Sequence, residues 1–413
     1  MYMKKAKAGY LFPLFALFVI FSDELFFSFV SLIGAELESG MKAKEAIVIA
    51  GIAYLLFGVD IIKHRFFQRN YTQFFVLFVI LVLYFITGLI YPHTDAYDNY
   101  KTSLLLYGAI CVPACYVGIR LARESYEEEI MRVLPYFVFF ISFVVARAVF
   151  SSSIRMTLLG HGEDDVFNYQ NSSYFLSFCY SYCFYYIFFW NRNGAEKKSF
   201  IQKFVRIIMI VLLFVCAISC ILGGGRGAFV YLIAISGYLI FRVITRGGKK
   251  KKNYITLLIL GIGIMAILFS QLNLFESTGF SRIQERLTSD DNRSDLWKNA
   301  MRVYEDSPLV GHGLGSIWWT VGFYSHNILT DLLAETGLIG ATIILLVFVK
   351  MLRSLVRYSK INTFDLFMLV IFLGALVHDS FSGYWFSSFK FYLIFGYVFT
   401  RSYSMLKHNI RNH

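Results

Sequence analysis

The chain is a series of long apolar segments separated by shorter polar ones. Many of the apolar segments run for roughly 18 to 22 residues with few or no charges, long enough for a helix to cross a hydrocarbon core of about 30 Å. Apolar residues follow one another without alternation, so the pattern predicts helices rather than strands. Twelve spans are expected, near residues 10–30, 46–62, 73–91, 102–119, 133–150, 172–190, 205–222, 227–242, 254–270, 326–349, 364–381 and 385–400.

The composition indicates that this apolar chain is a membrane protein. Of the 413 residues, 57% are hydrophobic and 16% are charged, whereas soluble globular proteins are about a quarter charged. The 44 Phe and 28 Tyr residues suit lipid-facing surfaces and interfacial belts. We therefore expect an all-α, polytopic integral membrane helical bundle, with residues 1–413 forming a single transmembrane domain.

The basic residues report topology. They cluster in the polar segments between spans, and if the N-terminus is cytoplasmic, most of the 39 Lys and Arg residues fall on the cytoplasmic side. The positive-inside rule therefore predicts that both termini are cytoplasmic, and the net charge of +12 does not indicate a nucleic-acid partner. Four lysines at 249–252 are interpreted as a topology anchor that attracts anionic lipid. The first apolar segment lacks a small-x-small cleavage site and is expected to stay as a span.

Three polar features fall on the outer face in this topology. They are the loop near 155–171, the tight turn GGGRG at 223–227, and the long segment 271–325, which is predicted to be a large periplasmic loop. The six cysteines all fall inside spans, in three i,i+4 pairs without a neighbouring His or carboxylate to complete a zinc site. They are expected to be small packing residues. The cysteines are Cys111, Cys115, Cys179, Cys183, Cys216 and Cys220.

Arg226 follows three glycines and directly precedes a new apolar span. A guanidinium at the outer boundary of a membrane is costly unless it snorkels or meets an anion. Gly224 and Gly225, with Gly227 on the other side, let the backbone turn sharply and approach a ligand, and the amides of the next helix point the same way. These residues are candidates for a phosphate site, and the alternative is a snorkelling turn residue.

Arg293 lies in a helix predicted from about residue 293 to residue 304 within the outer loop. The polar residues just before it can cap that helix. Arg282, Arg286 and Arg302 compete with Arg293 for a phosphate-binding role, and a solvated helix face is the simpler interpretation of these three.

His326 opens the tenth span and is followed by a polar stripe at i+4 steps, namely Asn327, Asp331 and Glu335. The helix dipole favours an acid near the start of the helix, which explains Asp331 in part, but Glu335 lies too deep for this. Glu335 is expected to orient a base, contact a substrate or pair with a basic residue. His326 can be a general base or a donor to an anion, and the alternative is an interfacial His without a task.

Two further motifs are weaker. GHGLGS at 311–316 resembles a glycine-rich phosphate loop, but it neither follows a strand nor opens a βαβ unit, so it is expected to shape a turn after Pro308. His161 is followed by three acidic residues within 163–165 without a second His at ligand spacing, so no metal is expected there. That loop, with Tyr169 and Gln170 after it, is instead expected to contact acceptor or sugar. His378 and Asp379 form another outer-face pair without an assigned role.

Together these motifs resemble the O-antigen polymerase and O-antigen ligase superfamily. GGGRGA resembles its "S-R-G" turn, with Gly225 where the family often has Ser. The run RSDLWKNAMRVYEDSPLVGHGLGS followed by SHNILTDLLAETGLIG resembles its C-terminal signature: Arg, Trp, "P-L-x-G-x-G-x-G", "H-N" and "E-x-G-x-x-G". The resemblance covers about 222–340 in motif and the whole chain in topology, and it implies a GT-C-like membrane glycosyltransferase fold.

The resemblance implies an inverting, metal-independent glycosyl transfer on the periplasmic face of the bacterial inner membrane, with no cofactor. The donor would be an undecaprenyl-diphosphate-linked glycan, with Arg226 and Arg293 clamping the diphosphate and His326 activating or positioning the acceptor hydroxyl. Membrane lipid and a chain-length regulator protein are further expected partners. A polymerase is favoured over a ligase acting on lipid A-core. A flippase is the alternative from another class, although no internal repeat supports it.

Overall fold

A computed structural model describes most of the chain. The described residues are 11–32, 41–64, 98–124, 126–150, 169–190, 200–245, 293–317, 324–385 and 388–411, with scattered positions between 255 and 284. All regular elements in these ranges are helices, which confirms the all-α prediction for this part of the chain.

The helices follow the apolar pattern closely. The expected span 10–30 is two helices rather than one, because the chain breaks at Phe21. The helix bounds are α1 Leu11–Ile20, α2 Ser22–Leu32, α3 Met41–His64, α5 Asp98–Arg123, α6 Glu127–Phe150, α8 Tyr169–Phe188, α9 Phe200–Gly223, α10 Arg226–Thr245, α13 Arg293–Asp306, α15 Ile328–Tyr358, α16 Thr363–Phe381 and α17 Phe389–Arg411.

Five of the described helices are long and apolar enough to cross a membrane. They are α6, α9, α10, α15 and α16, and α1 with α2 make a sixth if the bent pair is one span. The chain is therefore a multi-pass membrane protein. The span expected at 73–91 and parts of that expected at 254–270 lie outside the described residues, and α3, α5, α8 and α17 are not among the helices named above, so the total of twelve stays a prediction.

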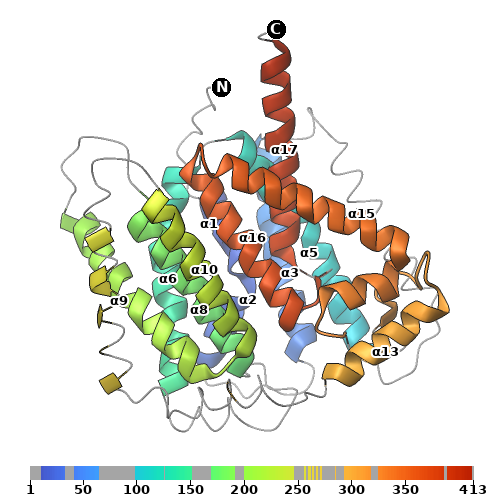
Figure 1. Ribbon diagram of the computed structural model, residues 1–413. Coiled ribbons are helices and arrows are strands. Elements are labelled where there is room, and N and C mark those ends of the chain that lie inside the picture. The colour runs from blue at the N-terminus through green and yellow to red at the C-terminus, as the bar shows by residue number, and fades with distance from the viewer. Residues whose placement is uncertain are drawn as a thin grey trace. The chain divides into compact units, whose positions relative to one another are not determined.

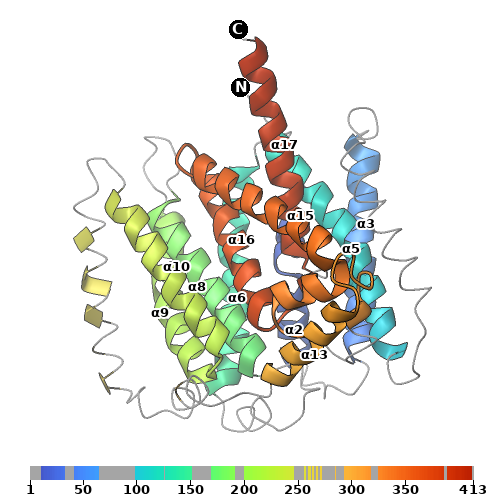
Figure 2. The same cartoon turned by 45° about the vertical axis from the view of Figure 1, so that its right-hand side comes forward.

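The chain divides into two compact units, each described by itself. Unit 2 contains residues 23–37 and 131–290, and so holds α2, most of α6, α8, α9 and α10. Helix α8 contacts both α9 and α10, and these three helices lie side by side in Figures 1 and 2. The cysteines of unit 2 are buried among these helices without disulfides, as packing residues should be. The Cys216 thiol, for example, bonds to the Ser142 hydroxyl at 3.2 Å.

Unit 1 contains residues 1–22, 38–130 and 291–413. Its tightest helix crossing joins α5 to α17, which run together in Figure 1. A Cβ on Gly118 would collide with the backbone of Leu393, and one on Gly396 with the carbonyl of Cys115. Small residues at these positions let the two backbones touch, which is the usual basis of close helix packing in membranes.

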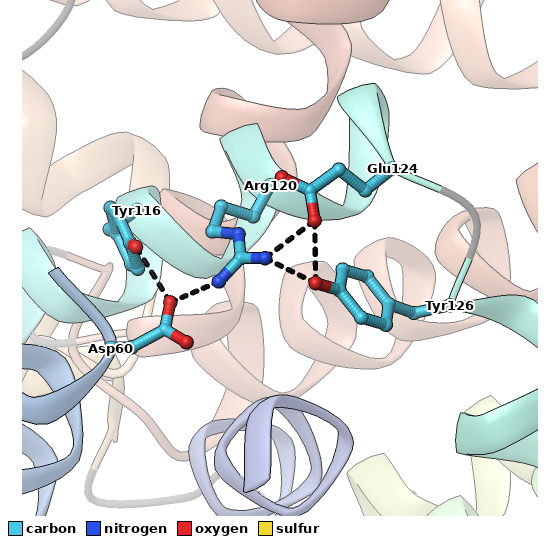
Figure 3. A network of polar contacts seen from close by, with 5 residues as sticks. All are labelled: Asp60, Tyr116, Arg120, Glu124 and Tyr126. Atoms are coloured by element: carbon cyan, nitrogen blue, oxygen red, sulfur yellow. Dashed lines mark hydrogen bonds and ion pairs between the residues drawn. The ribbon is translucent and has the colours of Figure 1, made fainter. Parts of the chain in front are cut away.

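A buried polar network joins α3 to α5 in unit 1, and Figure 3 shows its five residues. The Arg120 guanidinium is 1% exposed and donates to the carboxylates of Asp60 and Glu124. Tyr116 donates to the same Asp60 carboxylate at 2.6 Å. Tyr126, in the turn after α5, accepts from Arg120 and donates to Glu124, and burial raises the pKa of its phenol. Because the charges compensate one another, α3 can bury a carboxylate against α5.

We predict that Arg120→Ala lowers the free energy of unfolding by about 3 to 5 kcal/mol, because it leaves the buried Asp60 carboxylate without its cation. Arg353→Ala, which removes an exposed arginine of α15, is the control and should change little. Thermal unfolding of the protein in detergent measures both. Replacing both partners, as in Asp60→Leu with Arg120→Met, should cost less than Arg120→Ala alone, and equal losses in Arg120→Ala and the control would contradict this account.

Candidate functional site

Helix α15 is broken inside the membrane-spanning region. Gly337 has φ 62° and ψ −172°, a conformation that only glycine adopts without strain. The break leaves the preceding carbonyls without helical partners, and a glycine-rich loop satisfies them. The amide of His312 donates to the carbonyl of Ala334 at 3.2 Å, and the amide of Gly313 donates to that of Glu335 at 2.8 Å.

The same loop also binds the helix beyond the break. The amide of Leu338 donates to the carbonyl of Pro308 at 2.8 Å, and the amide of Ile339 donates to that of Leu309 at 3.1 Å. A Cβ on Gly337 would collide with the backbone of Leu309. The loop therefore supplies donors on one side of the break and acceptors on the other, so the buried backbone groups are paired.

The Glu335 side chain bonds to the last glycine of this loop. Gly311, Gly313 and Gly315 all have positive φ, at 67°, 98° and 82°. Loops of this kind can aim backbone amides at a bound acceptor, and here an acceptor is internal, because the amide of Gly315 donates to Oε1 of Glu335 at 3.0 Å. The hydroxyl of Tyr384 donates to the same oxygen. The loop thus shapes a turn after Pro308, as expected, and its amides serve the protein rather than a bound phosphate.

His326 lies at the entrance to α15 in a strained conformation. Its φ is 56°, and it is the one residue other than glycine with a positive φ in the described ranges. Asn327 caps the helix by accepting a hydrogen bond from the amide of Leu329 at 3.0 Å. The half-buried His326 ring meets the Tyr324 ring edge-on, with centroids 4.4 Å apart.

The residue before His326 is held from both sides. Ser325 is buried, and its amide donates to Oδ1 of Asp331 at 2.8 Å. Its carbonyl accepts from Nε1 of Trp297 in α13 at 3.0 Å. Its hydroxyl shares a 2.6 Å hydrogen bond with that of Thr330. The backbone conformation of the His326 turn is therefore fixed by contacts to two helices.

Arg293 is the first residue of α13, so the predicted helix is confirmed. The side chain of Arg293 lies outside what the structure describes, but Arg293 precedes Trp297 by four residues, about one helical turn. Arg302 is exposed and donates to the neighbouring Asn299 at 3.5 Å, in agreement with a solvated face. Arg282 and Arg286 lie outside the described residues.

Arg226 begins α10 directly after the turn, as the sequence predicted. Helix α9 ends at Gly223, and Gly224 has φ 76°. The amide of Gly225 donates to Oγ of Ser173 in α8 at 3.1 Å, which ties this turn to a third helix. Arg226 is half-buried, and Gly227 is buried. Since Arg226 belongs to unit 2 and His326 to unit 1, their meeting in one site stays a prediction.

The residues expected to contact substrate have internal partners where they are described. Asn327 caps α15, Asp331 binds the amide of Ser325, and Glu335 holds the glycine loop. Asp331 and Glu335 are fully buried. Tyr169 and Gln170 open α8, and their side chains lie outside the described residues. For all five, contact with substrate stays a prediction.

Several residues of this region have sequence signals too weak to single them out. Tyr384 follows α16 and reaches Glu335, while Tyr324 donates to the carbonyl of Ser382 at 2.6 Å. Ser173 and Ser325 act through short hydroxyl or backbone contacts. Tyrosine and serine are common throughout this chain, so pattern alone did not distinguish these residues. The Trp of the resemblance motif did mark Trp297, but not its partner.

The described residues contain no group of three or more His, Cys, Asp or Glu residues that could hold a metal ion. Nδ1 of His378 pairs with Oδ1 of the buried Asp379 at 2.8 Å. The loop around His161, where no metal was expected, lies outside the described residues.

The helical spans and the broken helix held by a polar loop define a polytopic membrane protein. Comparison with known proteins narrows this class. Residues 210–345, about a third of the chain, match the family model described as "O-Antigen ligase". This match confirms the resemblance to the O-antigen polymerase and ligase superfamily, and the matched segment includes Arg226, Arg293 and His326.

The chain is also similar to an uncharacterized protein of Haemophilus influenzae. The two are 25% identical over 221 residues, which cover 48% of this chain and 53% of that protein. The chain thus spans about half the length of this relative. No solved structure matches the chain.

We predict that Gly337→Ala destabilises the protein by about 2 to 4 kcal/mol, because the added Cβ meets the backbone of the glycine loop at a positive φ. Gly237→Ala is the control, since a Cβ at this position of α10 meets nothing within 4 Å. The control should be neutral or stabilise by up to about 1 kcal/mol. Thermal unfolding in detergent measures both, and similar stability of the two variants would refute the role given to the break.

We predict that Ser173→Ala speeds amide hydrogen exchange at Gly225 by about fivefold, because the turn before Arg226 loses a buried acceptor. Ser177→Ala is the control, because it removes a hydroxyl one turn further along α8 that donates to the carbonyl of Tyr174 in the same helix at 2.8 Å. Exchange measured by mass spectrometry over the peptide 223–229 decides the matter. Equal exchange in the two variants would show that Ser173 does not hold this turn.

Proposed function

We propose that this protein is an O-antigen, or related surface polysaccharide, polymerase. It transfers a growing glycan from undecaprenyl diphosphate to another undecaprenyl-diphosphate-linked repeat unit on the periplasmic face of the bacterial inner membrane. The family match over 210–345 supports the glycosyl transfer that a polymerase and a ligase share, because that segment contains each residue to which the proposal gives a chemical role.

The proposed reaction is a single inverting displacement. The acceptor hydroxyl forms a bond to C1 of the donor sugar as the bond from C1 to the diphosphate oxygen breaks. The hydroxyl proton goes to His326, and the electron pair leaves with undecaprenyl diphosphate. Arg226 and Arg293 neutralise the charge that develops on the diphosphate, a role for which guanidinium groups are suited because they bind phosphate through two parallel hydrogen bonds.

Local geometry supports these roles. Arg226 stands at the first position of α10, where the helix amides and the positive end of the dipole favour an anion. Helix α13, which begins at Arg293, is hydrogen-bonded through Trp297 to the residue preceding His326. A site at the membrane boundary suits substrates that arrive laterally on lipid tails.

A ligase is the second candidate, and the description of the matching family model favours it. The chemistry at the donor is the same in both cases. A ligase attaches the finished glycan to lipid A-core instead of to a lipid-linked repeat unit.

We predict that a strain lacking the gene makes lipopolysaccharide with one repeat unit on the core, because unpolymerised units can still be ligated. Gel electrophoresis of the lipopolysaccharide reads this directly. Bare core together with a lipid-linked polymer would contradict the polymerase and identify a ligase. A normal ladder of chain lengths would contradict both.

We also predict that Ala at Arg226, Arg293 or His326 lowers transfer by about 10²-fold or more while folded protein is retained, because each removes transition-state stabilisation or proton transfer. Arg302→Ala, at the exposed face of the same helix as Arg293, is the control and should transfer normally. Release of undecaprenyl diphosphate by purified protein is the measurement. Normal turnover in any one of the three variants removes that residue from the site.

A further inference from the structure

The strained backbone at His326 needs an explanation. A left-handed conformation at a residue other than glycine costs on the order of 1 to 3 kcal/mol, and it persists where surrounding contacts enforce it. Histidine is not required for such a turn, which glycine or asparagine would adopt more easily. The structure therefore maintains this conformation through its neighbours, and it determines the direction in which the imidazole projects.

The enforcing contacts act on the peptide groups of Ser325. Asp331 accepts a hydrogen bond from its amide and Trp297 donates one to its carbonyl, at 2.8 and 3.0 Å. The two partners come from different helices, α15 and α13. With donor and acceptor of one residue both fixed, the backbone that leads into His326 has little freedom to rotate.

The contact from Trp297 also sets the place of α13. This helix packs on α15 and buries Ala300 and Val303. The indole of Trp297 is 43% exposed, so burial alone does not account for its position, whereas its hydrogen bond to Ser325 does. Arg293 stands one turn before Trp297, so the same bond fixes the start of α13 relative to His326.

Asp331 is fully buried and uses one carboxylate oxygen for the Ser325 amide. Its other oxygen, Oδ2, has no hydrogen-bond partner among the described residues. Burying a polar side chain costs free energy unless its hydrogen bonds offset the cost. Asp331 thus provides the Ser325 amide with an acceptor at a site where an apolar side chain would be easier to bury.

We propose that Trp297 and Asp331 are positioning residues for His326. By holding the two peptide groups of Ser325, they fix the position of the imidazole and its placement relative to the start of α13. The inference rests on the proposed function for its catalytic consequence. It differs from the expectation that Asp331 contacts substrate, because here Asp331 acts through the backbone of the turn.

Amide hydrogen exchange on the purified full chain tests whether Trp297 and Asp331 hold the turn at His326. Trp297→Phe keeps an aromatic ring but loses the N–H donor, and Asp331→Ala loses the acceptor, so both should speed exchange over 324–327 about fivefold. Asp331→Asn keeps an acceptor oxygen and should exchange nearly as slowly as the wild type. Lys298→Ala, which removes an exposed ion pair beside Trp297, is the control. Unchanged exchange in both Trp297→Phe and Asp331→Ala would overturn the inference.

Enzyme kinetics test whether this positioning of His326 contributes to glycosyl transfer. Trp297→Phe and Asp331→Ala should lower kcat about fivefold or more with KM for the lipid-linked donor within about twofold, since they misplace a group without removing a substrate contact. Asp331→Asn should restore most of kcat. Because both residues act on the backbone of Ser325, the double variant should lose less than the product of the two single losses. A loss of transfer in Asp331→Asn with wild-type exchange would show that Asp331 contacts substrate, contrary to the proposal.

The two levels of the argument fail separately. If the wild-type protein transfers no glycan while exchange at 324–327 responds to the substitutions, the proposed function is wrong and the catalytic role falls with it. If the wild-type protein transfers glycan and neither exchange nor kcat responds, the positioning role is wrong and the proposed function stands.

Discussion

A break inside a membrane helix leaves backbone groups that lipid cannot satisfy, and the rest of this part of the molecule depends on how that constraint is met at Gly337. The glycine loop provides amides to the carbonyls before the break and carbonyls to the amides after it. The carboxylate of Glu335 then closes the loop through Gly315. The motifs "P-L-x-G-x-G-x-G" and "E-x-G-x-x-G" therefore form one structural unit, in which the loop pairs the backbone groups on both sides of the break.

The contacts that pair the backbone at the break also lie close to His326 in the sequence and the fold. Glu335 accepts a hydrogen bond from Tyr384 in the segment after α16, and Tyr324 donates one to Ser382 in that same segment. On the other side, Trp297 connects α13 to the turn. Polar residues that look like a substrate-binding stripe on α15 are thus used to hold loops together. The His326 side chain is left at the mouth of the helix.

How far the sequence predicted this can be judged from particular residues. The apolar runs were sufficient to place most of the described apolar helices, and the glycines around Arg226 correctly indicated a sharp turn into a new helix. The break between α1 and α2 was not expected, because residues 10–30 read as one apolar segment. The partners of Glu335 were not predictable either, since Gly315 and Tyr384 lie 20 and 49 residues away and carry no signal of pairing.

The account's central claim is that this chain forms glycosidic bonds at the expense of a lipid diphosphate. Purified protein reconstituted in liposomes with a defined undecaprenyl-diphosphate-linked repeat unit measures it most directly. The account predicts longer lipid-linked glycans, with one undecaprenyl diphosphate released for each bond formed. Movement of the lipid-linked sugar across the bilayer without any bond formation would contradict it and would identify a transporter.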